Sequence, residues 1–541
     1  MKTLIWLVLL LSLTSTPAGS EVENDQPTAP LLEGIGPLQF PISTNVPKAQ
    51  AYFNQALTLS FGFNHAEAVR SFREAARLDP TCGICYWGVA LALGPNINAP
   101  MGADAVQPAW QAVQDALARR EFENAHERAY IDAIASRYSP DGEDRTTLDL
   151  LYSGAMAGLV EQFPNDLHAR TLHAESLMDL MPWQYWLDDG SPANEHTITL
   201  VQELEHVLAA DPNHPGAAHL YIHAMERFEP HKAEAAADRL GSLVPVAGHL
   251  VHMPSHIYLR VGRYADAVDA NAKAAMADED YIAQCNAQGL YPAAYYPHNI
   301  HFLWYAAMME GRKALALDSA EKLAAKVPVA VAAQMGALQS YLAVPMYTYI
   351  RFGMWQEALA MDEPSSEIPY TLAMHLYGRG IAQAALGQTE EAKATLARLD
   401  QLGQTEAFQA LNMRMPGVND ELLGIARNLI AARIHRAEGS YDSEIEALTA
   451  AVRHQDALPY TEPPLWHYPV RQSLGDALLR TGAYDSAAAA FNDDLHHFPK
   501  NPWSLLGLEL VAKATGQDST DLAEDRAYAW RNADIKPTIV W

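Results

Sequence analysis

The stretch AQAYFNQALTLSFGFNHAEAVRSFREAARLDP, residues 49–80, decides the fold of this 541-residue chain. Apolar residues recur in it every three or four positions, which is the spacing of amphipathic helices, and Pro80 ends the pattern. Ala56 and Ala68 are small where two helices must approach closely, and Phe72 fills the gap beside them. The stretch therefore predicts two short helices packed against each other.

The same spacing returns near the C-terminus, counted from Tyr468. Its matching positions are Leu474, Gly475, Leu478, Ala487, Phe491 and Pro499. Turns of the form Gly-x-aromatic separate other helix pairs, at residues 262–264, 353–355, 439–441 and 482–484. Strictly alternating apolar and polar residues, which would indicate strands, are nearly absent. The sequence therefore predicts an all-α fold built from a repeated helix pair.

A repeat of ~34 residues with this order of aromatic, Leu, Gly, Ala, Phe and Pro positions resembles the tetratricopeptide repeat (TPR) family. The resemblance covers most of residues 47–520, and irregular spacers interrupt it near residues 95–110, 138–146, 181–196 and 281–297. It implies that residues 47–535 form a right-handed α-α superhelix, a TPR-like solenoid. It also implies a concave groove, lined by the first helix of each pair, that binds a protein or peptide partner.

The charge of the chain excludes two classes of partner. Acidic residues number 65 against 37 basic ones, so the formal net charge is −28. Binding to nucleic acid needs a basic face, and binding to anionic lipid needs a basic cluster; the sequence contains neither. Metal cations or a basic partner fit this negative field better.

The N-terminus has the composition of a signal peptide over residues 1–20. Lys2 provides the positive start, residues 4–13 are a short apolar stretch, and residues 18–20 are small enough for cleavage. We therefore expect an exported protein, periplasmic or secreted in a bacterial source, with residues 21–46 as an extended leader. No later stretch is apolar enough to span a membrane.

Histidines gather between residues 215 and 330, in the segments HLYIH (219–223), HLVHMPSH (249–256) and HNIH (298–301). The two HxxxH pairs lie 33 residues apart, which is almost one repeat. Residues three or four positions apart share a helix face, and the first helices of neighbouring repeats stack side by side. The spacing therefore predicts one patch of imidazoles. Its members are His219, His223, His249, His252, His256, His298 and His301.

Convergent imidazoles indicate a transition-metal site. Neutral imidazole binds Zn, Cu, Fe and Ni, and a His pair four residues apart can hold one ion. Seven such side chains suffice for one or two ions, for which Zn or Cu is favoured and Fe is the third choice. Neighbouring side chains would orient the rings or line the groove. The candidates are Glu226, Tyr258, Arg227, Arg260, Asn299 and Tyr305.

Two other interpretations of the histidines stay open at this stage. They can contact a protein or peptide partner without metal, which would make the chain an interaction scaffold, or they can be copies retained for packing. The chain lacks the motifs of serine hydrolases, phosphate-binding loops and HExxH metalloproteases, so the sequence leaves open whether it is an enzyme and names no catalytic residue. Cys82 and Cys85 form either a local disulfide or a pair of packing thiols.

Overall fold

The computed structural model describes residues 27–142, 144–285, 291–411 and 418–536. These residues are mostly helical. They contain no β-strand, only the isolated bridges Asn96–Ala99 and Trp186–Pro192. The predicted all-α fold is confirmed. The expected signal peptide, residues 1–20, lies outside the described residues.

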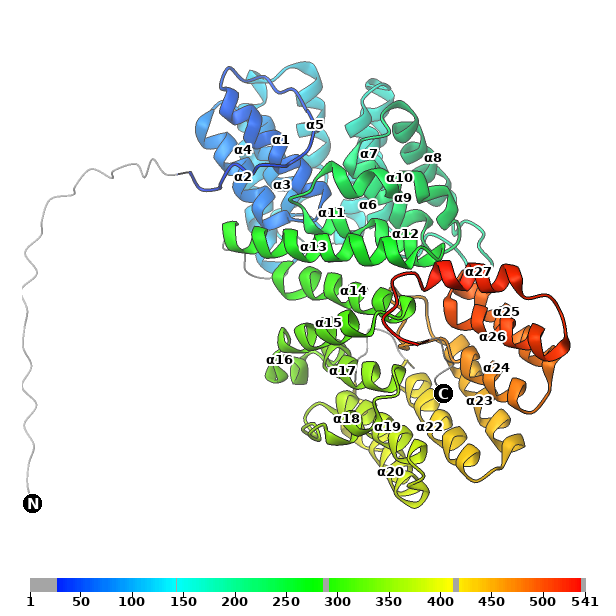
Figure 1. The fold of residues 1–541 in the computed structure, drawn as a ribbon. Coiled ribbons are helices and arrows are strands. Elements are labelled where there is room, and N and C mark those ends of the chain that lie inside the picture. Colours follow the sequence, from blue (N-terminus) through cyan, green and yellow to red (C-terminus); the bar gives the residue numbers. More distant parts are fainter. Residues whose placement is uncertain (1–26, 143, 286–290, 412–417, 537–541) are drawn as a thin grey trace, which may run out of the picture.

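The first half of the chain, coloured blue to green in Figure 1, forms helices α1 to α13. Their bounds are α1 Pro47–Phe61, α2 His65–Leu78, α3 Gly83–Leu93, α4 Val106–Arg119, α5 Ala125–Ala135, α6 Arg145–Gln162, α7 Leu167–Asp179, α8 Glu195–Ala210, α9 Pro215–Met225, α10 Pro230–Leu243, α11 Gly248–His252, α12 Pro254–Arg260 and α13 Tyr264–Cys285. Two short 3-10 turns flank α4, η1 Ala103–Ala105 and η2 Arg120–Phe122.

The second half begins with a short π turn, η3 Tyr291–Tyr295, and continues to α27. The remaining elements are α14 Tyr296–Glu310, α15 Lys313–Ala325, α16 Val329–Gln334, η4 Gly336–Leu338, α17 Gln339–Arg351, α18 Trp355–Ala360, α19 Pro369–Ala385, α20 Thr389–Gly403, α21 Glu406–Gln409, α22 Val418–Ala437, α23 Tyr441–Asp456, α24 Arg471–Arg480, α25 Tyr484–His497, α26 Pro502–Thr515 and α27 Thr520–Ala529.

Consecutive helices pack in pairs, as the repeat pattern predicts, for example α1 with α2, α7 with α8 and α24 with α25. The phenylalanine ring of the second helix packs directly against a glycine on a neighbouring helix. A Cβ built on Gly88 would lie 2.2 Å from the Phe72 ring, and one built on Gly475 would lie 2.5 Å from the Phe491 ring. Glycine at these positions is therefore a packing requirement, because any larger residue would push the helices apart.

The C-terminal helices return to the middle of the chain, where Figure 1 draws the red helix α27 near α13 and α14. The Tyr264 hydroxyl at the start of α13 donates a hydrogen bond to the carbonyl of Pro499 (3.1 Å). The Asp534 carboxylate accepts hydrogen bonds from the backbone of Lys313 and Ala314 in α15. This return carries the loop between α23 and α24 into the interior, where it meets the histidine-bearing helices.

Residues 27–46 contain no helix, but they pack against the first repeats. Phe40 is 1% exposed, and its ring contacts the rings of Phe53 and Tyr130. The backbone N–H of Leu32 donates to the Gln55 side chain (2.7 Å). This segment therefore completes the core at the N-terminal end of the array.

Two questions raised by the sequence are answered in the same region. Cys82 and Cys85 are joined by a disulfide at the start of α3, so they are not a pair of free packing thiols. Among the described residues, no helix combines the length and the apolar character that crossing a bilayer requires.

Candidate metal centre

Four neighbouring helices bring six of the seven predicted histidines together. Helix α9 carries His219 and His223, α11 carries His249 and His252, α12 carries His256, and α14 carries His298. Pro254, which has no backbone N–H, separates α11 from α12. The intervening Met253 keeps helical φ and ψ angles, so His252 and His256 still share one face.

The rings form two groups of three. We call His219, His223 and His249 the first triad, and His252, His256 and His298 the second triad. In each triad, one potential ligand atom from every residue lies within 4.8 Å of the others. The Nε2 atoms of His219 and His249 are 3.1 Å apart, and those of His252 and His256 are 2.9 Å apart. Each triad therefore has the convergence that a three-histidine metal site requires.

The two triads adjoin each other. The ring centroids of His223 and His256 are 5.7 Å apart, and those of His249 and His252 are 5.8 Å apart. Five of the six histidines are at most 3% exposed, and His298 is half-buried. The expectation of an open groove position is therefore wrong for these rings, because aromatic side chains from other segments cover them.

Hydrogen bonds at Nδ1 fix which nitrogens can bind metal. Nδ1 of His219 donates to the carbonyl of Phe61 (2.6 Å), which can only accept, so Nε2 carries the lone pair. Nδ1 of His252 lies 2.6 Å from Oδ1 of Asn271, whose Nδ2 donates to the carbonyl of Ala267. That second bond orients the amide, so His252 also presents its lone pair at Nε2.

At His256, two carboxylates are the acceptors at Nδ1, so Nε2 again faces another histidine. Its Nδ1 lies 2.6 Å from Oε2 of Glu226 and 3.3 Å from Oε2 of Glu462. Burial lowers the pKa of His256, but the two carboxylates outweigh that effect and raise it to about 9. Without metal, His256 is therefore protonated at neutral pH, and its Nε2 proton lies between its own ring and that of His252.

Four of the other rings are neutral at neutral pH. Burial lowers the pKa values of His219, His223, His249 and His252 well below the usual value, and the neighbouring imidazoles lower them further. Neither ring nitrogen of His223, nor Nδ1 of His249, has a hydrogen-bond partner among the described residues. Buried polar atoms without a partner cost free energy, which a bound ion would recover.

Aromatic residues cover both triads. The Phe63 ring centroid lies 4.6 Å from that of His219 and 5.4 Å from that of His249, and Phe302 lies 4.6 Å from His252. Trp183 packs edge-on against His223 (5.0 Å). Phe63 and Trp183 both have positive φ, 58° and 65°, a conformation that costs about 1–3 kcal/mol for a bulky residue and that gathers at functional sites.

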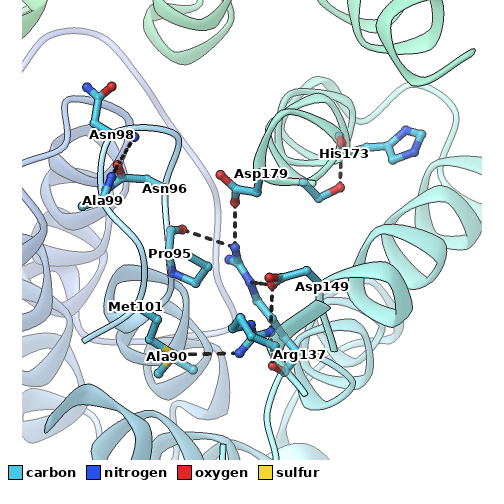
Figure 2. Close-up of polar contacts among 12 residues, drawn as sticks. Ala90, Pro95, Asn96, Asn98, Ala99, Met101, Arg137, Asp149, His173 and Asp179 are labelled. Atoms are coloured by element: carbon cyan, nitrogen blue, oxygen red, sulfur yellow. Dashed lines mark hydrogen bonds and ion pairs between the residues drawn. The ribbon is translucent and has the colours of Figure 1, made fainter. Parts of the chain in front are cut away.

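A buried ion-pair network holds the turn that contains Pro95 and Ile97, which contacts Trp183. Figure 2 shows the Arg137 guanidinium between Asp149 and Asp179, at 3.7 Å and 2.7 Å, with the carbonyl of Pro95 at 3.3 Å. Pro95 begins the turn that Asn96 closes onto Ala99. The next residue of this turn, Ile97, accepts a hydrogen bond from the indole of Trp183 (2.9 Å). Arg137 therefore holds the turn from Pro95 to Ala99, and this turn positions Trp183, which covers the first triad.

His301 does not join the cluster. Its ring stacks on Trp304 (5.3 Å) and contacts Tyr341 (5.2 Å). His298, one turn earlier on α14, is the residue whose ring approaches His252 (5.0 Å) and His256 (5.9 Å), whereas the two aromatic rings hold His301 in a separate contact. The sequence pattern included His301 in the histidine patch, but the structure places its ring against Trp304 and Tyr341 instead.

Two of the residues expected to orient the rings lie elsewhere. Tyr258 donates to Asp238 (2.9 Å), and Asn299 donates to Asp278 (2.7 Å). Asp278 also accepts from Tyr291, whose oxygen accepts the backbone N–H of His249. Asn299 therefore supports the backbone of α11 rather than an imidazole.

The remaining predicted residues are divided between the site and its surroundings. Glu226 orients His256, as predicted. Arg260 donates to the Glu226 carbonyl and lies 3.9 Å from Glu462, so it borders the site. Arg227 pairs with Asp188 instead, and Tyr305 is buried against Trp304.

Sequence patterns missed three residues that orient the rings: Phe61 through its carbonyl, Asn271 and Glu462. Phe61 and Glu462 are far from the histidines in sequence, and no local spacing connects them. Asn271 lies on α13, an Ala-rich helix that also carries several charged residues, so its polarity alone does not mark it in the sequence.

Comparison with known proteins supports the fold assignment. Family models described as tetratricopeptide repeat match residues 49–82 and 376–401. The first covers α1 and α2, and the second runs from α19 into α20. No curated protein matches the sequence.

Three solved structures are similar to this chain at low sequence identity. The TPR domain of P58(IPK) is 14% identical, with a TM-score of 0.24, and the match covers 80% of this chain and 99% of that one. Human IFIT1, solved as a dimer with m7Gppp-AAAA, is 12% identical, with a TM-score of 0.29 and 90% of each chain covered. Yeast Tom70 is 12% identical, with a TM-score of 0.30, covering 90% of this chain and 92% of that one. The chain therefore contains helix pairs of the tetratricopeptide repeat type, and family models match two of them, at residues 49–82 and 376–401.

Proposed function

We propose that this protein binds two transition-metal ions, one in each histidine triad. The observation that carries the proposal is the fixed direction of the lone pairs. Three separate acceptors, the Phe61 carbonyl, the Asn271 amide and the Glu226 carboxylate, hold Nδ1 of their histidines and turn Nε2 toward the ring of another histidine. A hydrogen-bond acceptor behind each ligand imidazole is the usual construction of a metal site.

The donor set favours particular metals. Each triad offers three imidazole nitrogens and no carboxylate as ligands, which suits Zn or Cu and does not suit Mg or Ca, whose ligands are oxygens. Three protein ligands leave a coordination position open for a small molecule, as in catalytic rather than purely structural sites. Fe often takes a carboxylate beside two histidines, so it fits less well.

We also propose that the protein is exported. The composition of residues 1–20 and the Cys82–Cys85 disulfide support an oxidising compartment, the periplasm or the medium. An exported protein acquires its metal outside the cytoplasm, so a site this enclosed would be loaded during folding or through its half-buried member, His298.

Metal content tests the proposal. The purified chain, loaded with Zn or Cu and passed over a desalting column, should retain two ions per chain by elemental analysis. His231→Ala is the control, because His231 is exposed on α10 and pairs with Glu234 away from both triads. A wild-type chain that retains no more metal than a variant lacking all six triad histidines would refute the proposal.

The family matches favour a second function that can coexist with the first. TPR arrays bind protein or peptide partners, and the matched repeats, residues 49–82 and 376–401, lie outside the helices that carry the triads. A partner captured by the intact chain and retained after chelation would support a scaffold role. A partner lost on chelation would tie recognition to the metal.

Asn271→Leu should weaken metal binding without changing a ligand. Leucine has the branched shape of asparagine, although it is larger, and removes the oxygen that orients His252; losses of this kind cost about 10–100-fold in affinity. Competition against a chelator measures the change. Asn271→Asp keeps an oxygen at the same place and should bind nearly as tightly as the wild type; equal affinity of the leucine variant would show that the amide does not orient a ligand.

Metal binding in the second triad should depend on pH. His256 must lose its Nε2 proton to bind an ion, and its pKa in the empty protein is about 9. The apparent affinity should therefore rise about tenfold per pH unit up to about pH 9 and level off above it, with one proton released per ion. The first triad, already neutral, should change little near neutrality. Isothermal titration in buffers of different ionisation enthalpy counts the protons; no release below pH 9 would contradict the assignment.

A further inference from the structure

A cavity of about 300 Å³ lies beside the first triad. The turn after α1, the start of α2, the turn at residues 94–102, the end of α13 and η3 line it. Phe63 and Tyr295 belong to this lining, and both also contact the first triad. The Phe63 ring centroid lies 4.6 Å from that of His219, and the Tyr295 centroid lies 4.9 Å from that of His249. The cavity therefore shares a wall with the proposed metal centre.

We propose that this cavity binds a small uncharged molecule with one aromatic ring and a hydrogen-bonding substituent, such as a phenol. Sites for small molecules enclose about 300–1,000 Å³ and combine aromatic walls with a few polar groups. This cavity lies at the lower end of that range, so its occupant is a single ring rather than a nucleotide-sized cofactor. The proposal does not depend on bound metal, since no triad histidine is among the described residues that line the cavity.

The aromatic walls favour a flat ligand. Besides Phe63, the lining includes the rings of Tyr281, Tyr291 and Tyr295. The centroids of Tyr281 and Tyr291 are 5.1 Å apart, and those of Tyr291 and Tyr295 are 5.3 Å apart with an angle of 23° between the ring planes. Aromatic rings prefer offset-stacked or edge-to-face contact with another ring at such separations. An aromatic ligand can therefore add one ring to this row, whereas a saturated ring of similar size gains no such contact.

The charged groups of the lining favour an uncharged ligand. The Glu67 carboxylate pairs with the Arg70 guanidinium (2.8 Å), which also donates to the carbonyls of Thr28 and Cys285. Most donors of Arg70 are thus engaged by the protein, and the described lining contains no second carboxylate for a cation. Burial lowers the pKa of His65 to about 4, so this ring is neutral at neutral pH. A charged ligand would lose its hydration without gaining an ion pair, which is costly.

The Asn64 amide supplies the polar contact. Asn64 lines the cavity, is 1% exposed, and precedes α2 without making a side-chain cap hydrogen bond. Burial raises the pKa values of Tyr281 and Tyr291, and the nearby Asn64 opposes this rise. Neither its amide nitrogen nor its oxygen has a hydrogen-bond partner of normal geometry among the described residues. A ligand hydroxyl, which both donates and accepts, would recover the free energy that this buried amide loses.

The wall formed by residues 94–102 is preformed. The side-chain oxygen of Asn96 accepts two backbone N–H groups and closes this turn (Figure 2). A Cβ built on Gly94 would lie 2.5 Å from the Tyr138 hydroxyl and 3.1 Å from the Arg137 guanidinium, so glycine lets the turn lie against the buried ion-pair network. A wall that is already ordered lowers the cost of binding.

Titration of the metal-free, full-length protein tests the proposal. Phenol, cyclohexanol and benzoate are added separately, and ligand-observed NMR measures the affinity of each. We expect phenol to bind at one site per chain. Cyclohexanol should bind about 2–10-fold more weakly, because it keeps the hydroxyl and the ring size but has no aromatic face. Benzoate, which keeps the aromatic ring but is charged, should bind more weakly than either alcohol.

Two variants locate the site. Ala66 is an exposed residue of the lining, so Ala66→Trp should block the opening without entering the core and should abolish phenol binding while the thermal melt stays unchanged. Asn64→Ala should weaken phenol binding about 2–10-fold, because it removes the polar contact. Asn165→Ala is the matched control, since Asn165 is exposed before α7 and lies outside the cavity; it should bind phenol as the wild type does.

Several results would overturn the proposal. Phenol that does not bind the wild type, or that binds Ala66→Trp equally well, would show that the cavity is not the site. Cyclohexanol or benzoate bound as tightly as phenol would show that aromatic contact or neutrality does not govern recognition. All these measurements use protein without metal, so their failure leaves the two-ion site standing, and a failure to retain metal leaves this proposal standing.

Discussion

His223→Leu should halve the metal content while leaving the metal-free protein at least as stable as the wild type. Both ring nitrogens of His223 are buried without a hydrogen bond among the described residues, and each such atom costs about 1–3 kcal/mol. Leucine fills a similar volume without that cost. In the first triad, however, it removes one of three ligands, so the chain should retain one ion instead of two.

The combination of the two readouts makes this variant informative. A histidine held for packing would lose stability on replacement and leave metal content unchanged, so denaturant melts of the stripped protein and elemental analysis of the loaded protein should be done together. Loss of stability with two ions still bound would contradict a ligand role for His223.

Arg137→Leu should destabilise the protein by about 3–5 kcal/mol, the largest effect on folding that we expect. Arg137 is 3% exposed and pairs with Asp179, which is as deeply buried. Burial raises the pKa of Asp179 well above its usual value, and Arg137 opposes that rise. Without the guanidinium, the buried Asp179 carboxylate loses its ion-pair partner, whereas Asp149 keeps Arg145 (2.7 Å), and the turn at Pro95 loses its anchor (Figure 2). Urea denaturation measures the change.

Arg120→Leu is the matched control for this prediction. Its partner, Asp132, is exposed, so solvent screens the pair and it should contribute little to stability. If the two substitutions lowered the free energy of unfolding equally, the buried Arg137 network would stabilise the fold no more than an exposed ion pair does.

The fold was largely predictable because its signal is local. The pattern that Tyr52, Ala56 and Phe72 represent lies within a single helix pair and recurs in other pairs. Each pair contacts mainly its neighbours. The return of the C-terminal helices onto α13 and α15 was not predictable, since it depends on contacts such as Tyr264 with Pro499, more than two hundred residues apart. That return brings Glu462 to His256.

Six of the seven histidines predicted for the cluster belong to it, and His301 does not. The two HxxxH pairs keep their phase, because α9 and the α11–α12 segment stand in equivalent positions. His298 and His301 follow an irregular spacer, so their phase could not be read from the repeat length. Burial was also not predictable: Phe63, Trp183 and Phe302 come from three segments, and the resemblance to TPR grooves implied an open surface.

The most direct test of the two-ion site is anomalous diffraction from crystals of the metal-loaded protein, collected at the absorption edge of the metal. The account predicts two adjacent peaks, one among His219, His223 and His249 and the other among His252, His256 and His298. Peaks only at surface histidines, or none inside the protein, would contradict it.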